Sequence, residues 1–263
     1  MGLMKHSRAS SRLFGPEKMP PAAEGAGCPE DDAFDLADRM ERGLARELLS
    51  DFVQPLPEVD GLWPFDVERS HDRSEYRLRC ARGQFLMLAQ VSRDRRRVSF
   101  FLYDSRERGL DMGAPAFTMS GDASGSEWRL VQERSDCHCR GRRPGCRCRE
   151  SWTLMDVAHS RKGVGAGVSH CLGVCCYMGA CEEMRLVSKL PTWSEEAQSM
   201  ILDFDRGQVL ASAKNFQLAP EGDPERVVCQ HAKTGPHSFG LDFKCPLTVI
   251  EAFGVALTTI LWG

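Results

Sequence analysis

The sequence predicts a mainly β fold wrapped around a C-terminal helix, and two patterns predict it. Short apolar or alternating segments recur from Phe65 to about Gly240, each bounded by Gly, Pro, Asp or Asn, which is typical of a sandwich or barrel. Residues 247–262 are then apolar on nearly every face of a helix, so that helix has to be buried on nearly every face. We therefore expect a sheet that encloses it.

Two segments precede the predicted sheet. Residues 1–33 are rich in Pro, Gly, Ala and Ser and have few large apolar groups, which predicts a disordered tail. Apolar residues then recur at helical spacing, which predicts an amphipathic helix over 34–53, capped by Asp31 or Asp32. Residues 54–263 form the predicted β domain.

The expected strands are short. They cover 76–80, 84–91, 97–103, 128–131, 152–157, 184–187, 200–204, 208–211, 216–218, 227–230 and 239–243, with the second and third joined as a hairpin. Pro246 is expected to open the helix, because proline fits the first helical position. That helix would be roughly 24 Å long, which is short for a bilayer, and Glu251 would be costly in lipid. A buried helix therefore explains the segment better than a transmembrane one.

Composition limits the classes of function. Apolar residues make up 42% and charged residues 27%, with a net charge of -3, so binding to nucleic acid or to an anionic membrane has to come from a local patch. No secretory signal and no apolar run of membrane-spanning length is visible, which predicts a cytoplasmic protein without a transmembrane segment. We expect no nucleic acid partner. The twelve cysteines are then expected to be reduced thiols.

An insertion near 137–149 is rich in cysteine and arginine. It forms a C-x-C-x6-C-x-C array, and three interpretations stay open: a tetrahedral zinc site, a redox-sensitive or palmitoylated loop, and an inert insertion. The zinc ligands would be Cys137, Cys139, Cys146 and Cys148. Zinc is the one cofactor under consideration. A second, apolar cluster over 171–181 suits buried thiols or palmitoylation.

No catalytic motif is found, so we expect a protein that is not an enzyme. G-x-S-x-G, Walker and G-x-G-x-x-G patterns are absent. The glycines over 163–167 lack the Lys-Ser/Thr end of a phosphate loop and predict a flexible turn. His159 and His170 have no evident partner and are interpreted as structural.

The C-terminal part resembles the tubby C-terminal domain. The matching stretches run from Leu190-Pro191-Thr192-Trp193 through Leu202-Asp203-Phe204, 209–213, Lys214-Asn215-Phe216-Gln217-Leu218, Asp223-Pro224, 227–230, 239–243, Cys245-Pro246-Leu247 and 251–257. Earlier, 51–57 resembles the opening of that domain, and 85–89 resembles its next hairpin. The resemblance is strong over 190–257 and patchy over 104–189.

This resemblance implies a closed antiparallel β-barrel threaded by the apolar C-terminal helix. Tubby-like domains bind phosphoinositides, chiefly phosphatidylinositol 4,5-bisphosphate, and couple membrane cargo to trafficking, often into cilia. The resemblance thus implies an anionic lipid and protein cargo as partners, at the plasma membrane or the cilium. A scaffold that has lost lipid binding, with or without zinc, is the alternative, and a scramblase-related lipid protein is a weaker one.

The lipid site that the resemblance implies is substituted in this sequence. The family holds the headgroup with a Lys and an Arg two residues apart on one strand, helped by an Asn on a neighbouring strand. Those positions correspond here to Thr118, Ser120 and Ser99. Two arginine-rich stretches are candidate replacements, one with Arg93, Arg95, Arg96 and Arg97 and one with Arg142 and Arg143. The first is alternatively a solvated loop that prevents edge aggregation.

Overall fold

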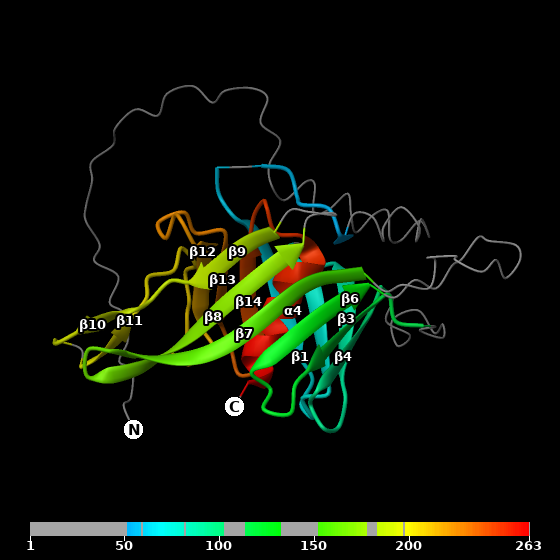
Figure 1. Ribbon diagram of the computed structural model, residues 1–263, viewed down its shortest axis with the longest axis horizontal. Coiled ribbons are helices and arrows are strands. Elements are labelled where there is room, and N and C mark those ends of the chain that lie inside the picture. Colours follow the sequence, from blue (N-terminus) through cyan, green and yellow to red (C-terminus); the bar gives the residue numbers. More distant parts are fainter. Residues whose placement is uncertain are drawn as a thin grey trace, which may run out of the picture.

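The computed structural model describes residues 52–58, 60–81, 83–102, 114–132, 152–177, 183–196 and 198–262. The predicted tail over 1–33, nearly all of the predicted helix over 34–53, and the insertion near 137–149 lie outside these residues. Cys137, Cys139, Cys146, Cys148, Arg142 and Arg143 lie outside them too. Figure 1 shows the described part as a ring of strands around one helix.

Within the described residues, twelve strands form one closed antiparallel barrel, as predicted. The barrel strands are β1 (Trp63–Arg69), β2 (Glu75–Cys80), β3 (Phe85–Val91), β4 (Arg97–Phe101), β5 (Phe117–Gly121), β6 (Glu127–Gln132), β7 (Trp152–Val164), β8 (Gly167–Tyr177), β9 (Glu183–Ser188), β12 (Phe216–Pro220), β13 (Cys229–Lys233) and β14 (Ser238–Phe243). A separate hairpin consists of β10 (Thr192–Ser194) and β11 (Ser199–Ile201). The first strand closes the ring by pairing with the last, Trp63 opposite Phe243.

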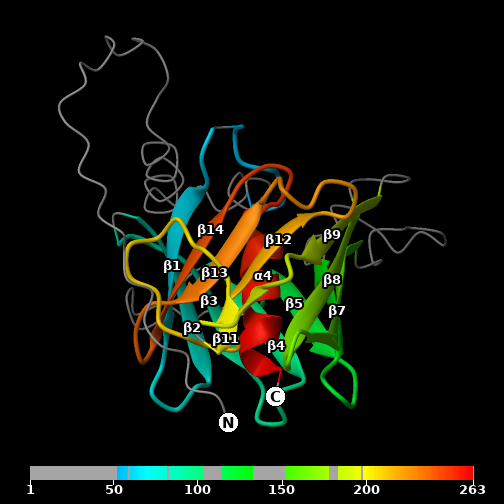
Figure 2. The same ribbon diagram turned by 90° about the vertical axis from the view of Figure 1, so that its left-hand side faces the viewer.

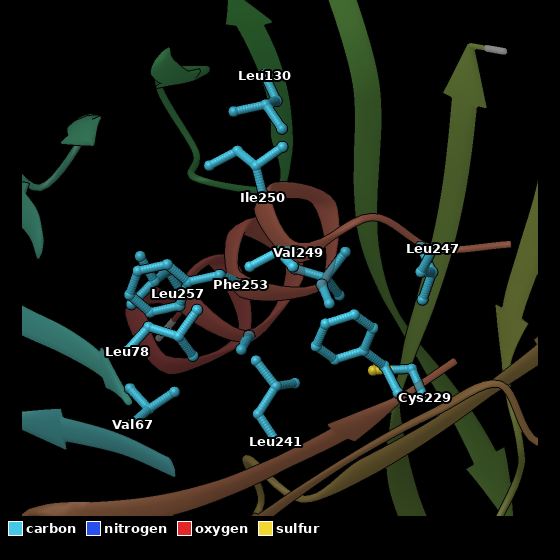
Figure 3. Packing of buried hydrophobic residues seen from close by; sticks show 14 of the residues in the cluster. Val67, Leu78, Leu130, Cys229, Leu241, Leu247, Val249, Ile250, Phe253 and Leu257 are labelled. Atoms are coloured by element: carbon cyan, nitrogen blue, oxygen red, sulfur yellow. The ribbon is translucent and has the colours of Figure 1, made fainter. Parts of the chain in front are cut away.

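The helix α4 (Val249–Leu261) lies inside the ring (Figure 2). Every one of its thirteen residues is buried, which confirms the prediction drawn from its apolar faces. Figure 3 shows its side chains pointing to all sides of the barrel, toward strand residues such as Val67, Leu130 and Leu241. The ring of Phe253 packs edge-on against Phe100 at 5.7 Å between centroids.

The helix begins three residues later than predicted. Its N-cap is Thr248, whose side chain accepts a hydrogen bond from the Glu251 main-chain N–H, while the Glu251 carboxylate accepts from the Thr248 N–H. This reciprocal capping satisfies two main-chain N–H groups that have no partner within the helix, those of Thr248 and Glu251. The helix therefore begins after Thr248, and Pro246 lies in the preceding loop. Burial raises the pKa of Glu251, and the capping hydrogen bonds act against that rise. The buried carboxyl therefore has partners inside the barrel.

Several predicted strands have other bounds. β7 extends well beyond the predicted 152–157, β1, β5 and β8 were not among the predicted strands, and residues 208–211 form no strand. The predicted strand over 200–204 is reduced to β11, and that over 227–230 begins at Cys229. Residues 208–211 are instead held by the side chain of Asn215, which donates to the Leu210 carbonyl (2.9 Å) and accepts from the Lys233 N–H (2.8 Å).

The loop before β12 is also fastened by Arg206. Its guanidinium lies against the carboxylates of Asp66 on β1 (3.0 Å) and Asp242 on β14 (3.3 Å). Gly240 leaves room for the Arg206 side chain, because a Cβ atom at position 240 would overlap the guanidinium. Burial raises the pKa of Asp242, which Arg206 opposes. This ion pair ties the loop across the seam where the barrel closes.

Candidate functional site

One end of the barrel carries most of the candidate residues. Because the barrel is antiparallel, the hairpins β1–β2, β3–β4, β5–β6, β7–β8 and β13–β14 all turn at the same end. The β3–β4 turn holds Arg93, Arg95, Arg96 and Arg97, as predicted, and all four are exposed. None of them forms an ion pair with a carboxylate in the described part of the chain.

The acidic residues of these turns are engaged locally. Asp94 accepts from the Ser92 hydroxyl and the Arg96 N–H, and these hydrogen bonds lower its pKa. Asp72 accepts from Ser70 and Ser74, which lowers its pKa to about 2. The Glu127 N–H and the Ser124 hydroxyl do the same for Asp122. The carboxylates thus shape the turns, while the Arg96 guanidinium donates to the Ala123 carbonyl of the β5–β6 turn (3.0 Å).

Cations from three separate segments converge beside the end of α4. Lys214 donates from Nζ to the main-chain oxygen of Trp262, and the guanidinium of Arg161 lies over the Trp262 ring at 5.1 Å from its centroid. Burial lowers the pKa of Lys214, and the charges of Arg95 and Arg161 lower it further. Arg95 comes from the β3–β4 turn and Arg161 from β7. We call the set Arg93, Arg95, Arg96, Arg97, Arg161, Lys162 and Lys214 the basic end.

Two histidines lie against this cluster. Nδ1 of His159 and Nε2 of His170 are 2.8 Å apart, and both rings stack on Trp262. Burial, followed by the charges of His170 and Lys214, lowers the pKa of His159 to about 3, and burial with the charge of Lys214 lowers that of His170 to about 4. Both rings are neutral at neutral pH. The view that these histidines have no partner was wrong, since each is the other's partner.

The substituted headgroup positions do come together. Ser99 on β4 lies opposite Thr118 on β5, and Ser120 lies opposite Arg97 on one side and Arg129 on the other. Thr118 is only 2% exposed, so it is closed to a ligand in this structure. Sequence reasoning missed Arg129. Alternation around Trp128 does put Arg129 on the outer face, but its place beside Ser120 depends on the register between strands.

Arg129 lines a groove of about 820 Å³ on the outer surface of strands β5 to β9. Its guanidinium contacts the carboxylate of Asp156 at 2.7 and 3.0 Å, and the Tyr177 hydroxyl donates to the same carboxylate (2.8 Å). Burial acts to raise the pKa of Asp156, yet these hydrogen bonds leave it lowered. Five carboxylates line the groove beside two arginines, Arg129 and Arg185, namely those of Asp122, Glu127, Asp156, Glu183 and Glu221. The groove is therefore acidic overall.

The described cysteines of the second cluster divide between two faces. Cys176 is buried against α4, whereas Cys171 and Cys175 are half-buried on the outer face. Burial raises the pKa of the Cys176 and Cys175 thiols, which disfavours thiolates there. The described residues include no group of three or more metal-ligating side chains. The predicted zinc ligands lie outside the described residues.

Comparisons with known proteins match the C-terminal third of the chain. The profile of the Tub family matches residues 178–260. The protein king tubby of Anopheles gambiae is 41% identical over 76 residues, which is 29% of this chain and 17% of that protein. Tubby protein homolog 1 of Caenorhabditis elegans is 39% identical over 74 residues, 28% of this chain and 17% of that protein. The aligned part thus covers less than a fifth of either relative. In the described part of the chain, no helix has the length and apolarity that crossing a bilayer requires.

Proposed function

We infer the function from the premise that this chain is a tubby-like protein, and we propose that it is a non-enzymatic adaptor which binds anionic, phosphoinositide-containing membranes through its basic end. On this proposal the protein is cytoplasmic and peripheral at the plasma membrane or the cilium. It would couple membrane-protein cargo to trafficking, as the family resemblance implies.

The observation that carries the proposal is the convergence of cations at one end of the barrel. Arg95, Arg161 and Lys214 come from separate segments and are close enough for their charges to act on one another. The carboxylates of the neighbouring turns are ionised, but they accept hydrogen bonds from serine hydroxyls and main-chain N–H groups rather than form ion pairs with the β3–β4 arginines. Each cation near an anionic surface contributes about 1 kcal/mol to binding. Several cations on one end therefore suffice for a reversible membrane contact.

The inherited headgroup positions contribute little on this proposal. Ser99 and Ser120 are neutral hydroxyls, and Thr118 is buried. A hydroxyl offers one neutral hydrogen bond where a charged group would contribute roughly 1.5–3 kcal/mol. We expect binding to depend on charge density, to discriminate weakly among phosphoinositides, and to weaken steeply with salt.

The groove on β5 to β9 favours protein cargo as a second partner. Five carboxylates against two arginines leave a net of three negative charges, and both arginines are already paired within the groove. An anionic headgroup would be repelled there, whereas a basic extended peptide would be complementary. The lipid contact and the cargo contact would thus occupy different faces, as an adaptor needs.

Vesicle flotation tests the lipid contact. The full chain is mixed with phosphatidylcholine vesicles that contain or lack phosphatidylinositol 4,5-bisphosphate. We expect replacement of Arg93, Arg95, Arg96 and Arg97 by Gln to abolish flotation, and the double variant Thr118→Ala, Ser120→Ala to keep it. A matched control replaces Arg226 and Lys244, two cations of loops at the opposite end of the barrel, by Gln, and should also keep it.

Two outcomes contradict the proposal in different ways. Loss of binding in the hydroxyl variant alone would show that the family's headgroup positions still hold the lipid. No flotation of the unmutated chain would favour the scaffold that has lost lipid binding, and the groove would then be the partner site to pursue.

A further inference from the structure

The hairpin of β7 and β8 projects beyond the wall of the barrel (Figure 1). Its ladder continues from His159 opposite Leu172 to Val164 opposite Gly167. β6 pairs with β7 only as far as Ala158, and β9 pairs with β8 only from Gly173 onward. The N–H of His159 still donates to the Ser126 carbonyl (2.7 Å), and that of Leu172 to the Ser188 hydroxyl on β9 (2.9 Å). Between these contacts, the segment 159–172, which we call the extension, pairs with no further barrel strand in the described part of the chain. Its turn lies at the same end as the basic end.

The extension is braced on one face. A Cβ at Gly165 would overlap the ring of Trp193 on β10, and one at Gly167 would meet the end of Met200 on β11. Ser169, which points to this side, is only 7% exposed. Isolated two-stranded hairpins are marginally stable, and packing of the β10–β11 hairpin against the extension helps to keep it ordered.

The other face of the extension combines an exposed aliphatic side chain with cations. Val168 is 69% exposed, the most exposed of the large apolar side chains in the described residues. Val168 pairs with Gly163 and Arg161 pairs with His170, so by alternation Val168 and Arg161 lie on the same face. Arg161 in turn lies near Lys214, whereas Lys162, the partner of Ser169, lies on the braced face. An apolar side chain therefore lies on the same face as Arg161, which is close to Lys214.

We propose that this face of the extension is a membrane anchor, with Val168 entering the interfacial layer of an anionic bilayer while Arg161 contacts the headgroups. The proposal rests on the proposed membrane binding of the basic end. Charge complementarity selects the occupant, because a bilayer offers an anionic layer directly above an apolar one. A single exposed valine on a protein surface is ordinary, but one at the tip of a braced projection beside the cations is placed for shallow insertion.

The test separates insertion from electrostatic attraction. Flotation on vesicles of phosphatidylcholine with phosphatidylinositol 4,5-bisphosphate is measured at low and high salt, together with the rise in surface pressure of a monolayer of the same lipids. Val168→Asn should weaken binding roughly fivefold to tenfold, abolish the salt-resistant fraction and reduce the pressure rise. Val168→Phe should strengthen binding, enlarge the salt-resistant fraction and increase the pressure rise.

Ile201 supplies the matched control. It is also an aliphatic residue of this region and 40% exposed, but it lies on β11, on the far side of the brace from Val168. Ile201→Asn should bind like the unmutated chain, and equal losses in both variants would overturn the assignment of the face. Unchanged binding and pressure in both Val168 variants, with normal flotation of the unmutated chain, would overturn the anchor alone. Absence of flotation by the unmutated chain would overturn the proposed membrane binding as well, and an acidic protein partner would then be the occupant to test.

Discussion

The ammonium of Lys214 donates a hydrogen bond to the main-chain oxygen of Trp262, so the loop before β12 is fastened to the end of the buried helix. Lys214→Met should lower the free energy of unfolding by about 1–2 kcal/mol, because a charge-assisted hydrogen bond to a helix-terminal carbonyl is lost. Urea denaturation measures the change. The exposed Lys162→Met is the control and should leave the stability unchanged. Equal stability of Lys214→Met and the unmutated chain would contradict a role for this contact.

Phe253 occupies the middle of the barrel core. Phe253→Ala should cost about 3–5 kcal/mol of unfolding free energy, because a fully buried ring is removed and the rigid wall of strands cannot collapse onto the cavity. Phe253→Leu should cost less than half of that. A shift in the denaturation midpoint with an unchanged slope is the expected signature. A cost below about 1 kcal/mol for the alanine variant would mean that the helix does not fill the barrel.

Arg206 neutralises Asp242, a largely buried carboxylate. Arg206→Met should cost about 2–3 kcal/mol at pH 7, since it leaves that charge without its cation. The pKa of Asp242 is already raised by burial and should rise further in the variant. A raised folded-state pKa favours folding below the unfolded value and loses that effect as pH rises, so the cost should shrink between pH 7 and pH 5. A cost independent of pH would refute this origin, and Arg206→Lys should recover part of the stability.

Stability should fall in mild acid because His231 is buried as a neutral ring. Burial lowers its pKa from 6.5 to about 4, while its Nδ1 lies 3.0 Å from the Lys214 carbonyl. The unfolded chain gains a proton that the folded chain does not, so stability present above pH 6.5 is lost as pH falls toward 4. This one residue should account for roughly 2 kcal/mol between pH 7 and pH 5. His231→Phe should reduce the pH dependence by about this amount and leave the part due to the buried His159 and His170, whereas His71→Gln, at an exposed site, should leave the profile unchanged.

Zinc at the C-x-C-x6-C-x-C array stays a prediction, because its four cysteines lie outside the described residues. If the array binds zinc, the purified chain should contain about one equivalent, and a chelator should change protease sensitivity only near 137–149. Cys139→Ser with Cys146→Ser should remove the metal, and Cys171→Ser should not. A metal-free protein under reducing conditions would leave the inert insertion and the reactive loop as the interpretations.

Local patterns were enough to predict most of the fold. The alternation of apolar and polar residues predicted many of the barrel strands. The apolar residues on every side of α4 predicted that this helix is buried in the core. The strand predicted over 208–211 failed for a physical reason, since its apolar residues have the strand pattern but their hydrogen bonds go partly to the side chain of Asn215. Likewise, the start of α4 depends on the reciprocal bonds of Thr248 and Glu251, which outweigh the preference of proline for a first helical turn.

The candidate site was only partly predictable. The β3–β4 arginines are adjacent in the sequence, so their clustering was visible. The approach of Arg161 and Lys214 to Arg95, and of Arg129 to Ser120, depends on which strands pair and in what register. No pattern within a single strand contains that information.

Closure of the barrel also constrains how the chain can fold during synthesis. β1 pairs with β14, which is synthesised much later, and the helix that fills the barrel follows β14. A nascent chain that ends before α4 therefore cannot bury its core. Pairings between such distant segments form slowly, which leaves apolar strand faces open to other chains in the meantime. We expect a premature stop codon anywhere before α4 to yield an aggregating or degraded product rather than a smaller working domain, so the codons of β14 and α4 are as important for folding as those of the first strand.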